Sequence, residues 1–145
     1  MTITHNFTVI CEDFRMEMSG KFILRGVFAN GLSTPQLPFP VPSLTFFQSF
    51  GTDEVGGRNF TATLRQLDDA GTLLATVKGQ IQASVVAPII LPIKLQNMRF
   101  MSFGTYTWSF EVEGQEPFLT EFKVMHNPGV GIRGVRVINP MQGGG

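Results

Sequence analysis

The sequence has little of what several specialised protein classes require. Its 145 residues include one cysteine, one tryptophan, one tyrosine and two histidines, and charged residues make up only 15%. The single Cys11 excludes an intrachain disulfide framework. Basic and acidic residues number 11 each, so no basic excess favours a nucleic-acid partner. Because hydrophobic residues reach 43%, the chain has the composition of one folded domain rather than of a disordered segment.

Long apolar runs are also missing. Residues 1–10 have no basic start and no apolar stretch, so no secretory signal is expected. The most apolar run, residues 83–95, is interrupted by two prolines, a serine and a lysine, and it is too short to cross a bilayer. The sequence therefore predicts a cytoplasmic protein without a membrane partner, and the lone cysteine suits a reducing compartment.

What the sequence does contain is the two-residue alternation of β-strands. From Tyr106 to Val112 every second residue is apolar, and threonine, serine and glutamate lie between them. Residues 117–125 repeat this alternation, and the intervening Gly114-Gln115 predicts a β-hairpin. Tyr106 and Trp108 share the inward phase of their strand.

Similar alternation marks several other segments, namely residues 7–12, 58–67, 72–77 and 80–86, with a turn at 68–71 that predicts a second hairpin. Residues 21–28 and 43–50 are apolar in both phases, which is typical of strands covered on both faces. In residues 93–101 the apolar phase changes, which predicts a β-bulge near Gln96-Asn97. Only residues 12–18 have a helix-forming composition, enough for one or two turns.

Eight or nine short strands separated by glycine, proline and aspartate turns predict an all-β fold, an immunoglobulin-like two-sheet antiparallel β-sandwich with an extended C-terminal tail. We expect the sandwich domain in residues 1–125 and a glycine-rich arm or edge strand in residues 126–145. Tyr106 follows a glycine at the start of a late strand, where a tyrosine can hydrogen-bond back across the sheet corner. The alternative is that Tyr106 is an ordinary core residue.

Four prolines fall within residues 33–43 and force extended backbone that lacks ladder donors. The spacing from Pro35 to Pro38 matches a PxxP ligand of an SH3-type groove, although no basic residue flanks it. The other interpretation, which we favour, is a stiff crossover between the two sheets, with Leu37, Phe39 and Val41 turned inward.

The C-terminal segment, residues 126–145, has two arginines and no acid, which leaves residues 1–125 with 9 basic and 11 acidic groups. It is too apolar for a plain solvated linker, since it contains Val130, Ile132, Val135, Val137 and Ile138. Two interpretations stay open. The segment is either a final edge strand of the same domain or an arm that adds a strand to a neighbouring subunit, with Arg133 and Arg136 facing acidic surface there.

Residues that could perform catalysis are few and scattered. His5 and His126 lie near opposite ends of the chain without metal-binding spacing. Cys11 shares the strand phase of Phe7 and Val9, which predicts a buried thiol rather than a nucleophile. Phosphate-binding and serine-hydrolase motifs are missing. We therefore expect no enzyme, no cofactor and no bound metal.

A glycan- or calcium-binding module is the alternative function. The acidic pairs Asp53-Glu54 and Asp68-Asp69 could supply oxygen ligands to calcium, but they flank opposite ends of one expected strand. Sugar-binding modules usually expose tryptophan and tyrosine rings, whereas Trp108 and Tyr106 are expected to point inward.

Phenylalanine is abundant, with 14 residues, while charge is low, so one small sandwich has more apolar surface than it can bury. In residues 43–50, Phe46 and Phe50 share one face of the strand and Phe47 takes the other. We expect a protein partner, a second copy or an assembly neighbour, to contact Phe46, Phe47, Phe50, Val130, Ile132, Arg133, Val135, Arg136 and Val137.

Three motifs resemble an uncharacterised family of small bacterial and phage β-sandwich proteins: CEDxR at residues 11–15, GKxxLxGxF at 20–28 and PFxxPxLxF at 38–46. The resemblance covers residues 6–125 and implies a sandwich fold without an activity or site residues. Occurrence beside phage-type genes would place the protein in a virion. The expected function is a non-catalytic structural or interaction module, in a homo-oligomer or a larger assembly such as a phage virion.

Overall fold

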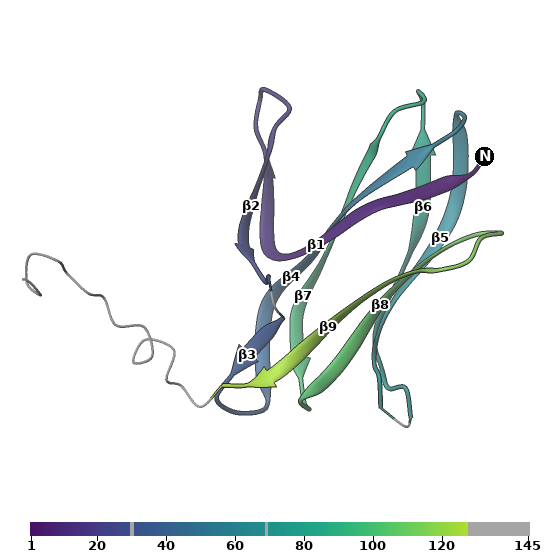
Figure 1. The fold of residues 1–145 in the computed structure, drawn as a ribbon. Helices are drawn as coiled ribbons and strands as arrows, with labels where there is room; N and C mark the ends of the chain where they lie inside the picture. Colours follow the sequence, from purple (N-terminus) through teal and green to yellow (C-terminus); the bar gives the residue numbers. More distant parts are fainter. Residues whose placement is uncertain (30, 69, 128–145) are drawn as a thin grey trace, which may run out of the picture.

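The computed structural model describes residues 1–29, 31–68 and 70–127, and over these residues the protein is built of strands (Figure 1). The nine strands of the described residues are β1 (Ile3–Met16), β2 (Phe22–Val27), β3 (Leu32–Thr34), β4 (Phe39–Thr52), β5 (Gly56–Gln66), β6 (Leu73–Ala83), β7 (Ile89–Phe100), β8 (Gly104–Val112) and β9 (Phe118–His126). This part of the chain contains no apolar helix of bilayer-spanning length.

Two sheets pack face to face, which confirms the two-sheet β-sandwich. The four-stranded sheet has the order β2-β1-β4-β7, and the five-stranded sheet has the order β3-β9-β8-β5-β6. One aspect of the expected fold is wrong, because the sandwich is not wholly antiparallel. The short β3 pairs in parallel with β9, with Leu32 opposite Val124.

The core between the sheets is aromatic. Phe46 of β4 stacks on Trp108 of β8 with ring centroids 3.9 Å apart, and Phe50 stacks on Phe110 at 4.7 Å. The indole Nε1 of Trp108 donates a 2.9 Å hydrogen bond to Oε1 of Gln48, so the one polar atom of this ring is satisfied inside the core. The inward phase expected for Tyr106 and Trp108 is confirmed, since both side chains are buried.

Most of the expected strands are present, but one of the two strands expected to be buried on both faces is exposed. The predicted hairpins are β8–β9 and β5–β6, both antiparallel. Residues 44–50 of β4 are buried throughout, as expected for a strand covered on both faces. Residues 21–28 are not. They form β2, the edge strand of its sheet, and most of β2 is exposed, so the prediction of two covered faces is wrong there.

The short helix expected at residues 12–18 is also wrong. Residues up to Met16 continue β1, and a tight turn follows in which Glu17 and Gly20 exchange backbone hydrogen bonds with neighbouring residues. Arg15 lies opposite Ile23, and Met16 lies opposite Phe22. Pairing with an adjacent strand has overridden a helical composition that is weak over so few residues.

The expected change of phase occurs at Asn97, which has a left-handed backbone with φ of 57°. The register between β4 and β7 nevertheless does not shift, since Val41 pairs with Met98 and Ser43 with Gln96. Pro42 lies opposite Asn97, so both strands change phase at the same level. The phase change is therefore confirmed, but it does not produce the register shift of a β-bulge.

The proline-rich segment is a crossover, as favoured above. It connects β3 of the five-stranded sheet to β4 of the four-stranded sheet, and the Leu37-Pro38 peptide bond is cis. Val41 is buried, and Leu37 and Phe39 are half-buried. The apolar side chains of this segment thus contribute to the sandwich and are not presented as a free ligand.

Tyr106 forms the expected corner. Its hydroxyl donates a 2.7 Å hydrogen bond to the carbonyl oxygen of Ser102, and burial raises the pKa of the phenol. We expect Tyr106→Phe to lower the free energy of unfolding by about 1 kcal/mol, because the Ser102 carbonyl loses its partner while the ring packing on Phe100 is kept. Urea unfolding measures this loss, and unchanged stability would reduce Tyr106 to an ordinary core residue.

Candidate interaction surfaces

Cys11 is a core residue. Its side chain is fully buried, and the thiol lies 3.4 Å from the carbonyl oxygen of Asp13. Burial first, and then the negative charge of Asp13, raise the pKa of this thiol above its ordinary value. The prediction that Cys11 is buried is therefore confirmed. A buried, protonated thiol is a poor nucleophile.

The two histidines lie at opposite ends of β9. His5 packs against Phe118 at the start of the strand, and His126, at its end, contacts Phe103. Eight residues of extended chain separate these positions by about 26 Å, too far for a shared metal. Among the residues that the structure describes, no three His, Cys, Asp or Glu side chains are grouped as metal ligands.

The residues needed for glycan or calcium binding are also apart or buried. Asp53 and Asp68 lie beyond opposite ends of β5, where each accepts hydrogen bonds from nearby backbone. The Thr72 N–H, together with other donors of the turn, lowers the pKa of Asp68. Trp108 and Tyr106 have 0% and 1% of their surface exposed, so neither ring offers a stacking platform.

The phenylalanines expected to contact a partner are occupied within the chain. Phe46 and Phe50 are completely buried between the sheets, so neither has surface to offer. Phe47, on the opposite face of β4, is 5% exposed. The remaining expected contact residues, Val130, Ile132, Arg133, Val135, Arg136 and Val137, lie outside the described residues.

Phe47 is covered by the rings of Phe7, Phe14 and Phe22, and these four side chains form the outer aromatic cluster. The Phe22 ring meets Phe47 edge-on at 5.1 Å, and Phe14 and Phe7 lie 6.0 Å and 6.5 Å from it. These rings come from β1, β2 and β4, so the cluster joins the outer face of the four-stranded sheet to the strands of its edge. Phe7 is 44% exposed, which leaves the cluster partly open to solvent.

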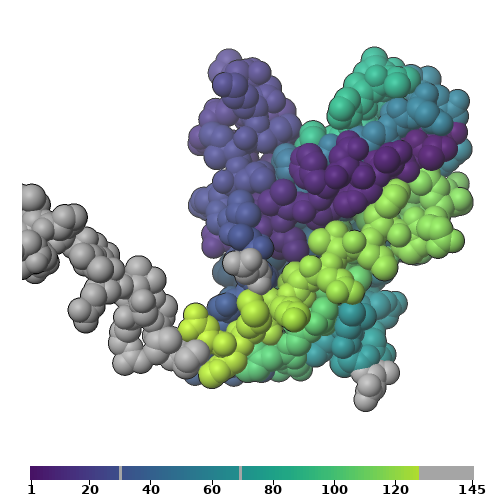
Figure 2. Space-filling view, in the orientation of Figure 1, coloured from purple at the N-terminus to yellow at the C-terminus, as the bar shows by residue number. Residues whose placement is uncertain are grey.

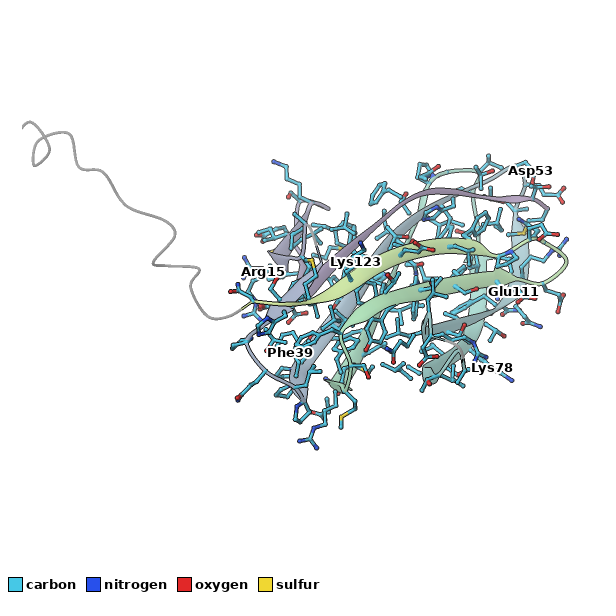
Figure 3. All side chains as sticks on the ribbon, turned by 60° about the horizontal axis from the view of Figure 1, so that its bottom comes forward. Arg15, Phe39, Asp53, Lys78, Glu111 and Lys123 are labelled. Carbon is cyan, nitrogen blue, oxygen red and sulfur yellow. The ribbon has the colours of Figure 1, made fainter. Side chains whose placement is uncertain are left out.

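Beyond this cluster, β1 bends away from β4 and continues with β2 as a projecting hairpin (Figure 1). In the space-filling view the hairpin is a separate lobe, divided by a notch from the β6–β7 end of the molecule (Figure 2). Arg15 marks it in Figure 3, far from Asp53. Its exposed apolar side chains define the hairpin surface. Ile23 and Val27 lie on one face of the hairpin, Met16 lies on the other face beside Phe22, and Met18 lies in the turn.

Two ion pairs of Asp13 connect the base of this hairpin to the sheet. The Asp13 carboxylate lies 3.2 Å from Nζ of Lys94 on β7 and 3.7 Å from a guanidinium nitrogen of Arg25 on β2. The Phe14 N–H and then Lys94 hold the pKa of Asp13 below its ordinary value. The link between β1, β2 and β7 is therefore present when this carboxyl is ionised and is lost as the pH falls through its lowered pKa.

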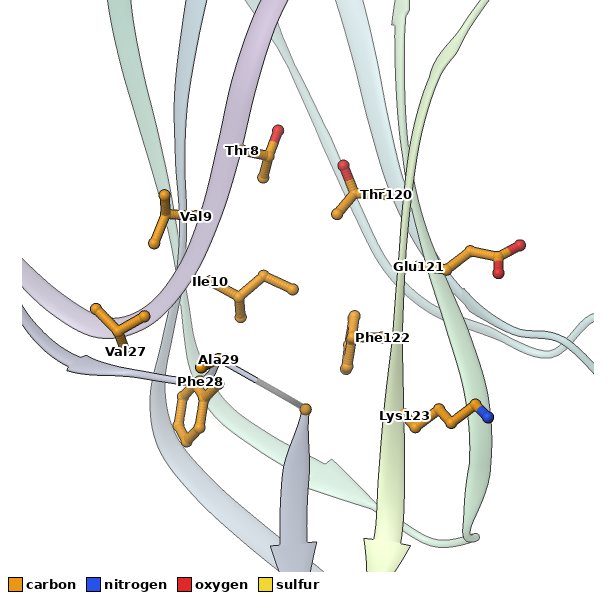
Figure 4. Close-up of a pocket in the computed structure, with 11 residues that line it drawn as sticks. Thr8, Val9, Ile10, Val27, Phe28, Ala29, Thr120, Glu121, Phe122 and Lys123 are labelled. Carbon is orange, nitrogen blue, oxygen red and sulfur yellow. The ribbon is translucent and has the colours of Figure 1, made fainter.

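A second feature is the β1–β9 groove, which lies at the open seam between the sheets and has a volume of about 490 Å³. Thr8 and Ile10 of β1 face Thr120 and Phe122 of β9 across it, while Glu121 and Lys123 point to the other side of β9 (Figure 4). Phe28 and Ala29 lie at one end. Ile10 and Phe122 are almost fully buried and form an apolar floor.

Sequence reasoning missed the hairpin surface. Residues 21–28 are apolar in both phases, and this pattern alone does not distinguish a covered strand from an apolar edge. A signal was present in the two turn-forming residues Ser19-Gly20, which allow residues 11–16 and 22–27 to pair as a hairpin. The β1–β9 groove had no sequence signal, because it depends on two strands that are about 110 residues apart.

Comparison with known protein families shows the family of this chain. A model of a family of unknown function, DUF6941, matches residues 6–125. The chain belongs to this family. The match spans the same residues as the resemblance noted above, and the family description assigns no activity. None of the curated proteins compared matches the chain.

Two solved structures that match this DUF6941 protein are similar to it at low sequence identity. An alkylpurine DNA glycosylase from Pseudomonas fluorescens has 7% identity and a TM-score of 0.49 over 85% of this chain and 30% of its own. A β-glucosidase from Erythrobacter marinus has 9% identity and a TM-score of 0.47 over 85% and 15%. The chain thus spans less than a third of either structure. Neither likeness carries an argument about function.

Proposed function

We propose that this protein is a non-catalytic structural or interaction module that works in an assembly, with a second copy of itself or a neighbouring protein covering the hairpin surface. An assembly of the kind found in a phage virion would suit such a module. The observation that carries the proposal is an apolar sheet edge that projects from the domain. Ile23 and Val27 are 43% and 52% exposed on β2.

An exposed apolar edge strand is unusual in a protein that works alone. Soluble proteins protect such edges with charge, proline or a covering segment, because unpaired backbone groups promote association. Within the described residues β2 pairs with β1 alone, and Arg25 is the one charged residue between Phe22 and Val27. Methionines at Met16 and Met18 add flexible apolar surface that adapts to a partner.

The glycan- or calcium-binding alternative gains no support from the residues that it needs. Trp108 and Tyr106 are core residues, and Asp53 and Asp68 are separated by the length of β5. The outer face of the five-stranded sheet carries a shallow groove with Thr63, Arg65 and Glu121 among its lining residues. It exposes no aromatic ring for a sugar.

The proposal is tested by Ile23→Lys in the full chain. If a second copy covers the hairpin surface, a lysine there loses hydration on association, and self-association should weaken at least about tenfold. Sedimentation velocity over a range of concentrations measures the association, and urea unfolding checks that the fold is retained. Val85→Lys is the matched control, because Val85 is 63% exposed in the β6–β7 loop, away from the hairpin.

Equal association of the wild-type chain and both variants would contradict self-assembly through the hairpin surface. A wild-type chain that stays monomeric at all concentrations would do so as well, and an assembly neighbour would have to be the partner. Weaker association of the Val85→Lys variant alone would move the contact to the β6–β7 loop.

A further inference from the structure

The β1–β9 groove is flanked by two strand edges that have no strand partner within the described residues. Near the start of β1, the Gln115 side chain bonds both the N–H and the carbonyl of Ile3. β2 reaches β1 only from Cys11 onward, and β3 reaches β9 only from Val124 onward. The first half of β1 and the first half of β9 therefore face one another across the seam without a strand between them. The two strands run in the same direction (Figure 1), so one added strand could be antiparallel to both.

Backbone orientation shows which groups are open to the groove. The Ile10 carbonyl accepts a hydrogen bond from the Phe28 N–H, on the side away from β4. Because backbone groups alternate sides along a strand, those of Thr8 point the same way. On β9 the Asn127 N–H donates to the Thr34 carbonyl, so the backbone groups of Glu121, in the same phase, point away from β8 and toward the groove.

We propose that residues 130–138 of a second copy of this chain bind in the β1–β9 groove as an added strand, pairing with the open edges at Thr8 and Glu121. This inference specifies a site for the self-assembly proposed above and rests on it. Five of the nine residues 130–138 are valine or isoleucine, which have high β-propensity and suit the apolar floor formed by Ile10 and Phe122. Main-chain pairing and alternate side-chain contacts are the usual basis of such strand addition.

Charge supports the same occupant. Residues 1–127 hold 9 basic and 11 acidic residues, whereas residues 128–145 add two arginines and no acid. Glu121 and Lys123 are both exposed beside the groove, and the Glu121 carboxylate can meet Arg133 or Arg136 of an incoming segment. The domain and its C-terminal segment are thus complementary in net charge.

The position of β3 favours a second copy over the same chain. Asn127 and Glu121 are six residues apart on β9, a distance of about 20 Å. Between them, β3 occupies the edge of β9, and Gly31 lies against the Lys123 backbone. Residue 130 is three residues from Asn127 and can reach no more than about 11 Å. Residues 130–132 therefore cannot lie beside Glu121 in their own chain, and the groove can take the whole segment 130–138 more readily from a second copy.

The experiment is disulfide trapping between full-length chains that carry single new cysteines. A Thr120→Cys chain is mixed with a tagged chain that carries Ile132→Cys or Val137→Cys, and mild oxidation follows. We expect a mixed disulfide dimer to form at least about tenfold faster than with Glu111→Cys as the groove-side partner, because docking raises the local thiol concentration. Glu111 is exposed on the outer face of the five-stranded sheet, and Cys11 is buried and present in every chain.

A backbone variant separates docking from chance collision. Glu121→Pro removes the N–H that faces the groove and leaves the β8–β9 ladder intact, so trapping should fall to the control rate. Glu121→Ala keeps this N–H and removes only the carboxylate, so trapping should weaken but stay well above the control rate. Trapping at the control rate with both tail cysteines overturns the inference, as does an intrachain disulfide formed in preference in a doubly substituted chain. If trapping fails while Ile23→Lys still weakens association, the groove inference is wrong and the proposed function stands.

Discussion

Replacing Trp108 with alanine should lower the free energy of unfolding by about 3–5 kcal/mol. Trp108 is completely buried and stacks on Phe46 at 3.9 Å, so truncation opens a large cavity between the sheets. It also leaves the Gln48 side-chain oxygen without its buried donor. Urea unfolding at fixed protein concentration measures the loss. A change below about 1 kcal/mol would show that Trp108 is not packed as described.

A double-mutant cycle isolates the polar part of this effect. Trp108→Phe keeps an aromatic ring but leaves Oε1 of Gln48 unpaired, at a cost of about 1–3 kcal/mol beyond the lost ring volume. In a Gln48→Leu background the acceptor is gone, so Trp108→Phe should cost less by about 1–2 kcal/mol. Leu119→Ala, at a 60% exposed position on β9, is the control and should change stability by no more than about 0.5 kcal/mol. Additive effects at Trp108 and Gln48 would contradict the hydrogen bond.

Gly31→Ala should detach β3 from β9, with a loss of about 2 kcal/mol or more. Gly31 has φ of +96°, and an added Cβ would lie 2.4 Å from the Lys123 carbonyl oxygen. The obstacle is backbone, so no side-chain rotation relieves it. Hydrogen exchange gives the local measurement, because the Asn127 N–H bonded to the Thr34 carbonyl should lose protection while the β8–β9 amides keep theirs.

Gly20→Ala is the matched control for Gly31→Ala. Gly20 has a similar φ of +85°, but an added Cβ there meets nothing within 4 Å. Gly20→Ala should therefore lower the free energy of unfolding only through backbone strain, by about 1 kcal/mol. If both variants lose the same stability and Asn127 remains protected, close contact of Gly31 with β9 does not hold β3 in place.

The prediction of strands succeeded where apolar and polar residues alternate along the chain, as in β8. Tyr106 and Trp108 were placed inward because a strand with one polar face can bury only the other, and both side chains are buried. The prediction failed at residues 12–18, where a helical composition over seven residues was overridden by pairing with β2. Local preference decides secondary structure only where no neighbouring strand competes.

The candidate surfaces were less predictable. Phe46, Phe47 and Phe50 were expected at a partner because 14 phenylalanines with little charge indicate excess apolar surface. The opposite sheet instead buries Phe46 and Phe50, and the outer aromatic cluster covers Phe47. The exposed apolar residues lie instead on the β1–β2 hairpin. Exposure depends on which strands end at an edge, and the order of strands in a sheet cannot be read from alternation.

The sequence by itself determined the fold class, the inward faces of the alternating strands and the family, since each depends on local pattern or on motifs within short segments. It left two interpretations of Tyr106, and the structure decided for the corner. Only the tertiary structure decided that β3 crosses to the edge of β9, that β2 is an exposed edge, and that β1 and β9 leave a groove between them. These features arise from contacts between residues far apart in the chain, and no periodicity within a segment encodes which distant strand becomes its neighbour.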